Sequence, residues 1–257
     1  MRYQSTTGLE PDQIRELITR IRQVLTPPGQ RGGRPAALDV SRSVLLTLVL
    51  LRHNLSQTVA GDLFGISQPT VSRIFRRFLP LIEQVLCLHT PALPDVLTGR
   101  VVLVDGTLVP TGKRAGHDEA NYSGKRHKAG LSVQILSDLS GCLLGVSAPV
   151  PGRTHDRNAY TLTGLDELLS HTEVIGDLGY QGTDVIRPRR KRPGHRKHTP
   201  EDTVWNLGIS QLRWAVERAI GHWKNWKILA TGYRARLAEL PNIIRIVTTL
   251  EYYRLGW

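Results

Sequence analysis

The sequence predicts an α/β domain that follows a small, all-α N-terminal domain. Two short apolar segments, RVVLVDGT and EVIGDLGY, are typical of buried strands, and residues 57–78 have the spacing of two helices that cross at a tight turn. Between these regions, Pro91 and Pro94 interrupt a helical pattern. We therefore expect a helical domain over residues 1–98 and the α/β domain over residues 99–257.

The segment QTVAGDLFGISQPTVSRIFRRF (residues 57–78) carries the residue types of a helix-turn-helix. Gly61 is small where the two helices must approach, Gly65 permits a left-handed turn, and Ser67 is a favourable N-cap for the second helix. An ordinary helical hairpin in a bundle is the alternative. As a DNA reader, the second helix would present a polar and basic face to a major groove: Gln68, Thr70, Ser72, Arg73, Arg76 and Arg77.

Further helices are expected on both sides of this motif. Apolar residues recur at helical spacing over residues 11–25 and 39–51, and the stretch between them is rich in proline, glycine and arginine. That stretch is either a linker or a basic arm. A last helix is expected from Pro241 to about Arg254.

The charge of the chain favours a polyanionic partner. Lysine and arginine number 34 against 22 aspartate and glutamate residues, a formal net charge of +12. Nucleic acid is the simplest such partner, although a merely soluble basic protein would share the excess. Cys87 and Cys142 have no metal-binding spacing, and the longest apolar run, near residues 44–51, is too short to span a bilayer. We expect a soluble, cytoplasmic protein without a membrane partner.

The α/β part holds further strands and one strongly basic segment. Residues 131–136 and 143–150 are expected to form two strands joined by a turn, and PGRTHDRNAY leads into a helix that runs to Leu169. The run RPRRKRPGHRKH, residues 187–198, is dense in cations. A charged loop and a nucleic-acid contact are equally open interpretations of that run.

Carboxylates stand at the ends of the two apolar strands. Asp105 and Asp177 occupy these positions, where a carboxylate is costly unless it is paired or bound to a metal. A helix expected over residues 209–227 carries on one face, at steps of four and seven, Arg213, Glu217 and Lys224. By itself that face is typical of an exposed row of ion pairs. Since sites gather at strand ends in α/β sheets and hard cations take several oxygen ligands, we expect Asp105, Asp177 and Glu217 to form a site for two divalent ions.

Asp156 is the main competitor for the second carboxylate position. It follows His155 after a Pro-Gly turn, where it can cap the next helix or contact the metal ligands without binding the metal itself. Asp177 is preferred as a ligand because it ends the better strand. His155 is expected to be structural or to face DNA, since Mg²⁺ prefers oxygen.

These motifs together resemble the DDE transposases of bacterial insertion sequences, in the group related to Harbinger elements (the "insertion sequence five" group). The likeness is carried by LVDGT, PGRTHD, IGDLGY and RWAVERAIGHWK, and it extends from about Asp39 onward. In that family the final helix bears Tyr-x2-Arg-x3-Glu-x6-Lys. Arg213, Glu217 and Lys224 match this pattern, whereas Ser210 stands where the tyrosine is expected.

The resemblance implies a ribonuclease-H-like catalytic domain behind an N-terminal helix-turn-helix. It implies Asp105, Asp177 and Glu217 as catalytic metal ligands for Mg²⁺, with Mn²⁺ as a substitute and two ions in the site. Arg213 and Lys224 would contact phosphate or DNA. The partners would be double-stranded DNA, as terminal inverted repeats and as target, and a second copy of the chain in a homodimer or larger assembly.

The same resemblance implies hydrolytic nicking at transposon ends, followed by attack of the freed 3′-hydroxyl on target DNA. The setting would be the bacterial cytoplasm, in association with the nucleoid. Two alternatives share the sequence features. One is a catalytically inactive, transposase-derived DNA-binding protein, and the other is a ribonuclease-H-like DNA endonuclease without strand transfer.

Overall fold

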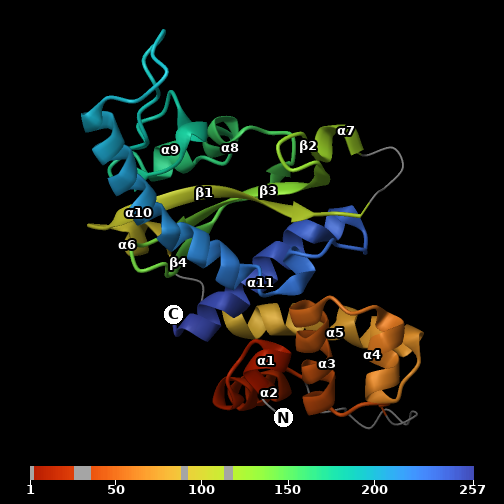
Figure 1. The fold of residues 1–257 in the computed structure, drawn as a ribbon. Coiled ribbons are helices and arrows are strands. Elements are labelled where there is room, and N and C mark those ends of the chain that lie inside the picture. The colour runs from red at the N-terminus through yellow and green to blue at the C-terminus, as the bar shows by residue number, and fades with distance from the viewer. Residues whose placement is uncertain (1–2, 26–35, 88–91, 113–117) are drawn as a thin grey trace. The chain divides into compact units, whose positions relative to one another are not determined.

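The computed structural model describes residues 3–25, 36–87, 92–112 and 118–257, and they belong to two compact units. The helical unit comprises residues 1–91, 224–231 and 238–257, and the sheet unit comprises residues 92–223 and 232–237. Figure 1 shows the elements of each unit. Residues 238–257, which were expected to belong to the second domain, are therefore part of the helical unit.

The helical unit is built from helices that begin at favourable caps. Asp39 caps α3 because its side chain accepts a hydrogen bond from the backbone N–H of Arg42, and Pro11 opens α2 in its first turn. These caps explain why the expected helices begin where they do. The described elements of this unit are α1 (Tyr3–Thr7), α2 (Pro11–Val24), α3 (Val40–His53), α4 (Gln57–Phe64), α5 (Gln68–Leu86), η3 (Lys227–Leu229) and α11 (Leu240–Leu255).

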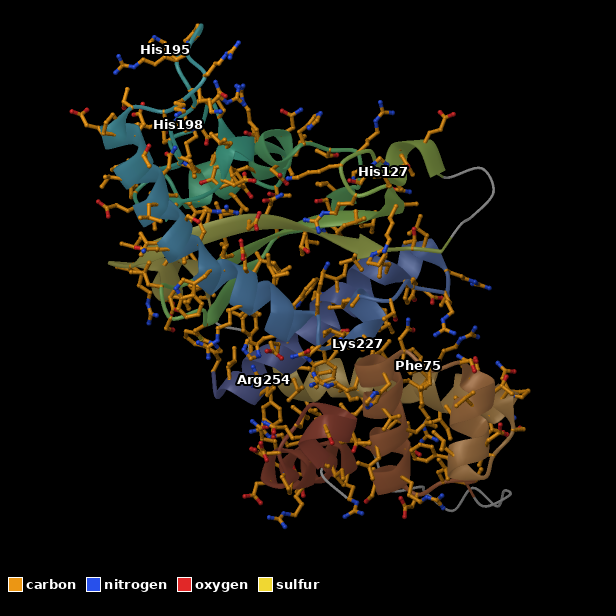
Figure 2. All side chains as sticks on the ribbon, viewed as in Figure 1. Phe75, His127, His195, His198, Lys227 and Arg254 are labelled. Carbon is orange, nitrogen blue, oxygen red and sulfur yellow. The ribbon has the colours of Figure 1, made fainter. Side chains whose placement is uncertain are left out.

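Helices α4 and α5 have the expected helix-turn-helix geometry. Gly65 ends α4 in the left-handed conformation, with φ of 70°, and Gly61 lies so close to the turn that an added Cβ would come 2.6 Å from the carbonyl oxygen of Ile66. Phe75, labelled in Figure 2, packs with its neighbours against a core cluster shared by α3, α4 and α5. The buried members of that cluster are Leu38, Leu46, Leu50, Ala60 and Val71.

Helix α11 belongs to the helical unit because both apolar and polar contacts hold it there. It packs against α5, and Arg245 on α11 forms an ion pair with Glu83 on α5. Glu251 on α11 is buried, and its carboxylate accepts a 2.9 Å hydrogen bond from the indole N–H of Trp226. A buried carboxylate requires such partners, and here they come from the segment that precedes η3 and from α11 itself.

The sheet unit is a mixed six-stranded sheet with helices on both faces. The strand order is β2-β3-β1-β6, and β4 and β5 also pair with β3; β1 is antiparallel to β3 and parallel to β6. Helices α8 and α9 lie on one side of the sheet and α10 crosses the other (Figure 1). The strands are β1 (Val101–Pro110), β2 (Tyr122–Ser123), β3 (Lys128–Ser137), β4 (Leu143–Val146), β5 (Val150–Pro151) and β6 (Glu173–Ile175).

The helices of the sheet unit correct several expected boundaries. Pro94 does not interrupt a helix but lies in the first turn of α6, where a proline is tolerated. Helix α10 begins earlier than expected and ends at Trp223, before Lys224. The helices of this unit are α6 (Leu93–Leu97), α7 (Asp118–Asn121), α8 (Asp156–Leu162), α9 (Leu165–Leu168) and α10 (Pro200–Trp223). Across the ranges that the structure describes, we find no helix with both the length and the apolar character needed to cross a membrane.

Candidate active site

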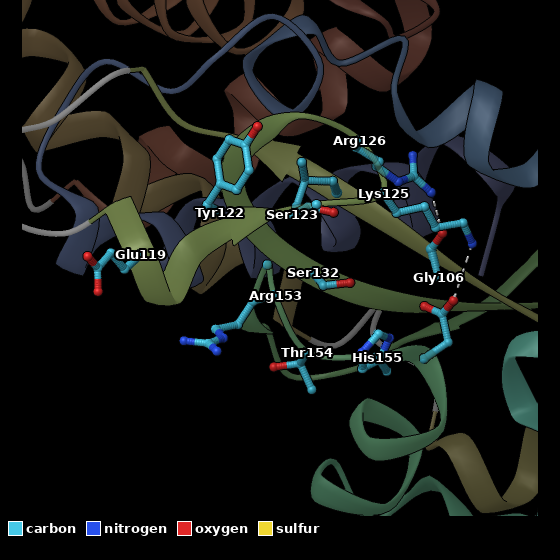
Figure 3. Close-up of a pocket in the computed structure, with 14 residues that line it drawn as sticks. Gly106, Glu119, Tyr122, Ser123, Lys125, Arg126, Ser132, Arg153, Thr154 and His155 are labelled. Atoms are coloured by element: carbon cyan, nitrogen blue, oxygen red, sulfur yellow. Dashed lines mark hydrogen bonds and ion pairs between the residues drawn. The ribbon is translucent and has the colours of Figure 1, made fainter.

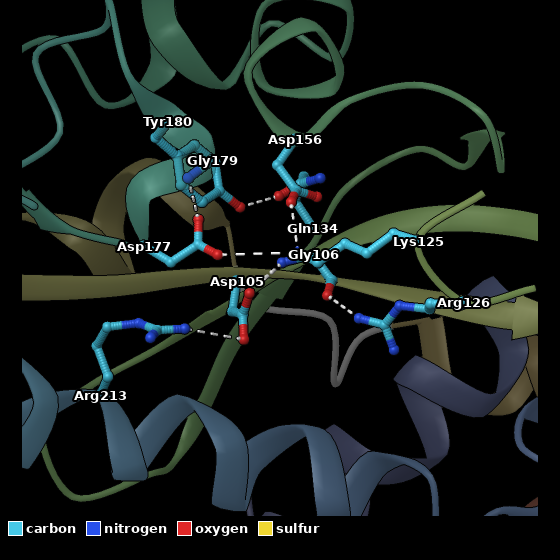
Figure 4. A network of polar contacts seen from close by, with 10 residues as sticks. All are labelled: Asp105, Gly106, Lys125, Arg126, Gln134, Asp156, Asp177, Gly179, Tyr180 and Arg213. Atoms are coloured by element: carbon cyan, nitrogen blue, oxygen red, sulfur yellow. Dashed lines mark hydrogen bonds and ion pairs between the residues drawn. The ribbon is translucent and has the colours of Figure 1, made fainter. Parts of the chain in front are cut away.

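Three aspartates from different elements lie around Gly106 (Figure 4). Asp105 is inside β1, not at its end as expected, because the strand continues to Pro110. Asp177 follows β6, the parallel neighbour of β1, and the pairing of Leu103 with Ile175 places Asp177 level with Asp105. Asp156 is the first residue of α8. The chain therefore brings together carboxylates that are separated by as many as 72 positions in sequence.

Asp105 has the most buried side chain of the three aspartates, with 18% exposed against 19% for Asp156 and 22% for Asp177. Its oxygens accept hydrogen bonds from the backbone N–H of Gly106 at 2.8 Å and from Arg213 Nη2 at 3.4 Å. Burial raises the pKa of Asp105 to about 6; the cation of Arg213 opposes this shift, while the negative charges of Asp177 and Asp156 add to it. The carboxylate of Asp105 is therefore close enough to Asp177 and Asp156 for their charges to act on it.

Lys125 joins the other two aspartates. Its Nζ lies 3.7 Å from Asp156 Oδ2 and 4.0 Å from Asp177 Oδ2. The Lys125 side chain is 71% exposed, so solvent screens this charge and the side chain can leave at little cost. The next residue, Arg126, donates a 2.8 Å hydrogen bond to the carbonyl oxygen of Gly106 and ties the same loop to β1.

Close packing around Gly106 and Gly179 sets the distances between the aspartates. A Cβ added at Gly106 would collide with Asp156 Oδ1, and one added at Gly179 would come 2.7 Å from Asp177 Oδ1 and 3.0 Å from Asp156 Oδ2. Behind them, the buried Tyr180 hydroxyl donates to Gln134 Oε1. Burial raises the pKa of Tyr180 well above its ordinary value, and the three aspartates add to that shift.

The structure corrects the role expected for Asp156 as a helix cap. His155 is the N-cap of α8, and no side-chain capping hydrogen bond is made there. The carboxylate of Asp156 is directed instead at Gly106 and Lys125 (Figure 4). The sequence held one signal for this position, the PGRTHD motif, but it held none for Lys125.

Glu217 and Lys224 are placed differently from the aspartates. Glu217 is exposed on α10, about 6 Å along the helix axis from Arg213, and none of the hydrogen bonds or ion pairs that join the three aspartates includes it. Within the described parts of the chain, no group of three or more Asp, Glu, His or Cys side chains is spaced to hold a metal ion. Lys224 follows the end of α10 and belongs to the helical unit, so it does not share a helix face with Arg213.

The aspartate site nevertheless fits a hard divalent cation by its chemistry. Its donors are carboxylate oxygens, which Mg²⁺ and Mn²⁺ prefer. Burial is the main cause of the raised pKa of Asp105, and the negative charges of Asp177 and Asp156, which a bound cation would offset, add to it. Two cationic side chains, Lys125 and Arg213, already lie against these oxygens, which shows where positive charge is favoured.

The expected DNA-reading face of α5 is accessible. Gln68, Arg73, Arg76 and Arg77 are exposed, while Thr70 and Ser72 are half-buried. Arg73 donates to the carbonyl oxygen of Pro69 and to Thr70 Oγ1, both at 3.3 Å, so its guanidinium is held along the start of the helix. Ser67 is the N-cap as expected, although its hydroxyl contacts Thr70 Oγ1 and caps no backbone N–H.

The basic segment 187–198 is anchored at its start to α10. The backbone N–H of Arg189 donates to Asn206 Oδ1 at 2.7 Å, and the Arg189 guanidinium pairs with Asp202 at 3.2 Å and lies over the ring of Trp205 at 5.0 Å. Figure 2 shows His195 and His198 on the part that leads into α10. The first part of the segment is therefore a structured basic surface of the sheet unit.

A mixed sheet with Asp105 on β1, Asp177 just after the adjacent β6 and Asp156 at the start of α8, together with a helix-turn-helix, is the arrangement of a DNA-processing protein with a ribonuclease-H-like α/β domain. Residues 104–251 match the family described as DDE superfamily endonuclease, and residues 36–88 match the helix-turn-helix of DDE superfamily endonuclease. The chain belongs to this superfamily, as a DDE-type insertion-sequence transposase with an N-terminal helix-turn-helix.

Curated relatives agree with the family assignment. The chain is 30% identical, over 87% of its length and 83% of the relative's, to a protein of Streptomyces albus G whose name assigns it as a transposase for insertion sequence element IS112. It is 24% identical, over 88% of its length and 85% of the relative's, to a protein of Microchaete diplosiphon assigned as a transposase for insertion sequence element IS702. A solved piggyBac transposase synaptic complex with hairpin DNA aligns with a TM-score of 0.47 and 11% identity over 99% of this chain and 74% of that chain.

Proposed function

We propose that this protein binds the terminal inverted repeats of its own element and catalyses divalent-metal-dependent DNA cleavage and strand transfer. The observation that most directly supports the chemistry is the gathering of Asp105, Asp156 and Asp177 around Gly106 in a DDE superfamily chain. Clustered carboxylates on a strongly basic protein are explained if they bind the divalent ions that phosphodiester chemistry uses.

Asp105, Asp177 and Glu217 are the proposed metal ligands. The parallel pairing of β1 with β6 supports Asp105 and Asp177, and the position of Glu217 one turn beyond Arg213, which reaches Asp105, supports the third. When bound, two divalent ions would activate a water or a 3′-hydroxyl and stabilise the leaving oxygen. Mg²⁺ is the expected ion, with Mn²⁺ as a substitute.

The cationic side chains of the site are proposed to exchange carboxylate partners for phosphate. Lys125 and Arg213 lie against the aspartates at 3.4–4.0 Å, and a DNA phosphate placed there would take over their charges. Arg126 keeps the Gly106 carbonyl fixed, which holds Asp105 in position on β1. Asp156 is proposed as a positioning residue that orients Lys125. Lys224 is proposed as a further DNA contact.

Recognition of the element ends is proposed for α5, and less specific backbone binding for residues 187–198. The exposed arginines of α5 suit phosphate and base contacts in a major groove. Because two transposon ends must be joined in one reaction, we propose that the protein acts as a homodimer or a larger assembly.

A cleavage assay tests this proposal directly. A labelled duplex that carries the element's own end is incubated with and without Mg²⁺ or Mn²⁺, using wild type, Asp177→Asn, Glu217→Gln and Asp156→Asn, with Asp62→Asn on the exposed surface of α4 as the matched control. We expect nicking at the element boundary to require metal, to be lost in Asp177→Asn and Glu217→Gln, and to be weakened in Asp156→Asn. Binding of the duplex should persist in all variants.

Other outcomes of the assay identify the alternatives. Nicking that persists in Glu217→Gln and disappears in Asp156→Asn would make Asp156 the third ligand. Nicking without joining to target DNA would identify an endonuclease without strand transfer. Binding without nicking in either metal would identify an inactive, DNA-binding descendant and refute the proposed chemistry.

A further inference from the structure

The side chain of Gln134 on β3 is fully buried in the sheet unit, yet one end of its amide is unpaired. Its Oε1 accepts a hydrogen bond from the hydroxyl of Tyr180, whereas its Nε2 has no hydrogen-bond partner among the described residues. A buried donor without a partner costs free energy, so such groups are uncommon in folded proteins. The Nε2 group of Gln134 is therefore a candidate for a contact that forms only during the reaction.

The unpaired Nε2 group faces the carboxylate of Asp156 across Gly106 (Figure 4). A Cβ built on Gly106 would lie 3.3 Å from Gln134 Nε2 and would collide with Asp156 Oδ1, so both atoms border the same small space. A Cβ built on Gly179 would come 3.0 Å from Asp156 Oδ2, so the carboxylate is confined from a second side. A small rotation of either side chain is therefore enough to join Nε2 to Oδ1.

Tyr180 and Asp156 together determine which end of the Gln134 amide faces the site. Burial raises the pKa of Tyr180 well above its ordinary value, so the hydroxyl stays protonated and can donate to Gln134 Oε1. The reverse orientation of the amide would direct an acceptor, Oε1, at the carboxylate of Asp156. The orientation with Nε2 toward Asp156 is therefore the one that charge favours.

Lys125 occupies the other oxygen of Asp156 and is free to leave it. Its Nζ lies 3.7 Å from Asp156 Oδ2, and its side chain is 71% exposed. Gly106, Lys125 and Asp156 line a cavity of about 690 Å³ (Figure 3), so an incoming phosphate can reach Lys125. Once Lys125 binds phosphate, the carboxylate of Asp156 has lost a cation and gains from another donor.

We propose that Gln134 is a positioning residue for the reaction: its Nε2 donates a hydrogen bond to Asp156 Oδ1 and keeps this carboxylate over Gly106 when Lys125 moves to phosphate. The proposal rests on the proposed function, in which Lys125 exchanges its carboxylate partners for phosphate. The new hydrogen bond satisfies the donor of Gln134 and an acceptor of Asp156 in one step. Tyr180 supports the contact because it holds the other end of the amide.

The contact is tested without metal or DNA, by NMR on the full chain labelled with ¹⁵N-glutamine in EDTA. The side-chain amide signals of Gln134 are assigned by their absence in Gln134→Met, and those of the other glutamines report whether each variant is folded. We expect Lys125→Met to shift one Gln134 amide proton downfield, because the donor then pairs with a carboxylate. Lys125→Met combined with Asp156→Leu, a side chain of similar shape without an acceptor, should abolish the shift. Lys128→Met, an exposed lysine on the same strand, is the matched control and should leave the signals unchanged.

The effect on the reaction is tested with an apolar pair. Gln134→Met combined with Tyr180→Phe removes both partners of the buried hydrogen bond and leaves no new unpaired group, so the Tm should change little. We expect the single-turnover nicking rate of this variant to fall about 10- to 100-fold. Added to Asp156→Leu, the same pair should slow nicking no further, since both changes remove one interaction. Gln211→Met on the exposed surface of α10 is the matched control and should nick at the wild-type rate.

The outcomes separate failure of this proposal from failure of the proposed function. An amide signal that does not move in Lys125→Met, or that still moves when Asp156→Leu is added, overturns the contact. Unchanged nicking in the variant with the apolar pair, or a loss that adds to that of Asp156→Leu, overturns the positioning role. A shift that depends on Asp156 supports the contact even when wild type fails to nick the duplex in Mg²⁺ or Mn²⁺, an outcome that would refute only the proposed chemistry.

Discussion

Replacement of Asp105 by asparagine should stabilise the metal-free protein while it abolishes cleavage. A pKa of about 6 in place of 3.8 means that ionised Asp105 costs the folded state about 3 kcal/mol relative to a neutral side chain of the same shape. The sign follows from the direction of the shift: between pH 4 and 6 the folded state binds the additional proton, so wild-type stability falls as the pH rises through that window. Asparagine stays neutral at every pH, so the Asp105→Asn variant does not lose stability in this window.

The assay is thermal unfolding of wild type and Asp105→Asn in EDTA at pH 8 and at pH 4. We expect a gain of about 2–3 kcal/mol, or about 4–10 °C in Tm, at pH 8, and little difference at pH 4, where both side chains are neutral in the folded state. Glu217→Gln is the matched control, because Glu217 is exposed and should leave Tm unchanged at both pH values. Added Mg²⁺ should raise the Tm of wild type and not that of Asp105→Asn. An Asp105→Asn variant that is less stable than wild type at pH 8 would refute this account of the site.

Three further predictions concern the helical unit. Gly61→Ala should destabilise the protein by about 1–3 kcal/mol in urea unfolding, because its Cβ would come 2.6 Å from the Ile66 carbonyl oxygen; unchanged stability would mean that the turn can shift. Arg73→Ala combined with Arg76→Ala should weaken binding to element ends and reduce the slope of log K against log salt by about 1–2; an unchanged slope would exclude α5 as the DNA-contacting helix. Trp226→Phe should cost about 1–3 kcal/mol, because a buried carboxylate loses its indole donor, and a neutral result in the same unfolding assay would contradict this.

The helix-turn-helix shows how much of this protein local sequence determines. Its turn depends on Gly65 in the left-handed conformation and on Gly61 at the contact with Ile66, and both requirements act within a few residues. Apolar residues at helical spacing then complete a core over three neighbouring helices. Strand β1 and its aspartate were likewise expected from a short apolar run, although the strand extends beyond Asp105 to Pro110.

Contacts between distant segments decided the composition of the candidate site. Lys125 comes from a polar connection without any periodic signal, yet it reaches both Asp156 and Asp177. Asp156 has the sequence features of a helix cap, and only the close approach of α8 to Gly106 turns its carboxylate toward the sheet. Glu217 keeps its expected helix, but the side chain that reaches Asp105 from α10 is Arg213.

The sequence by itself determined the class of this protein: its helices, its main strands, and the motifs that place it among the DDE-type transposases, because caps, turns and apolar periodicity act over a few residues. The tertiary structure decided which charges meet and to which unit α11 belongs. The ion pair of Arg245 with Glu83 and the hydrogen bond of Trp226 with Glu251 join positions far apart in the chain. Such pairings depend on how the chain folds back on itself, since burial makes an unpaired charge costly wherever its partner lies in the sequence.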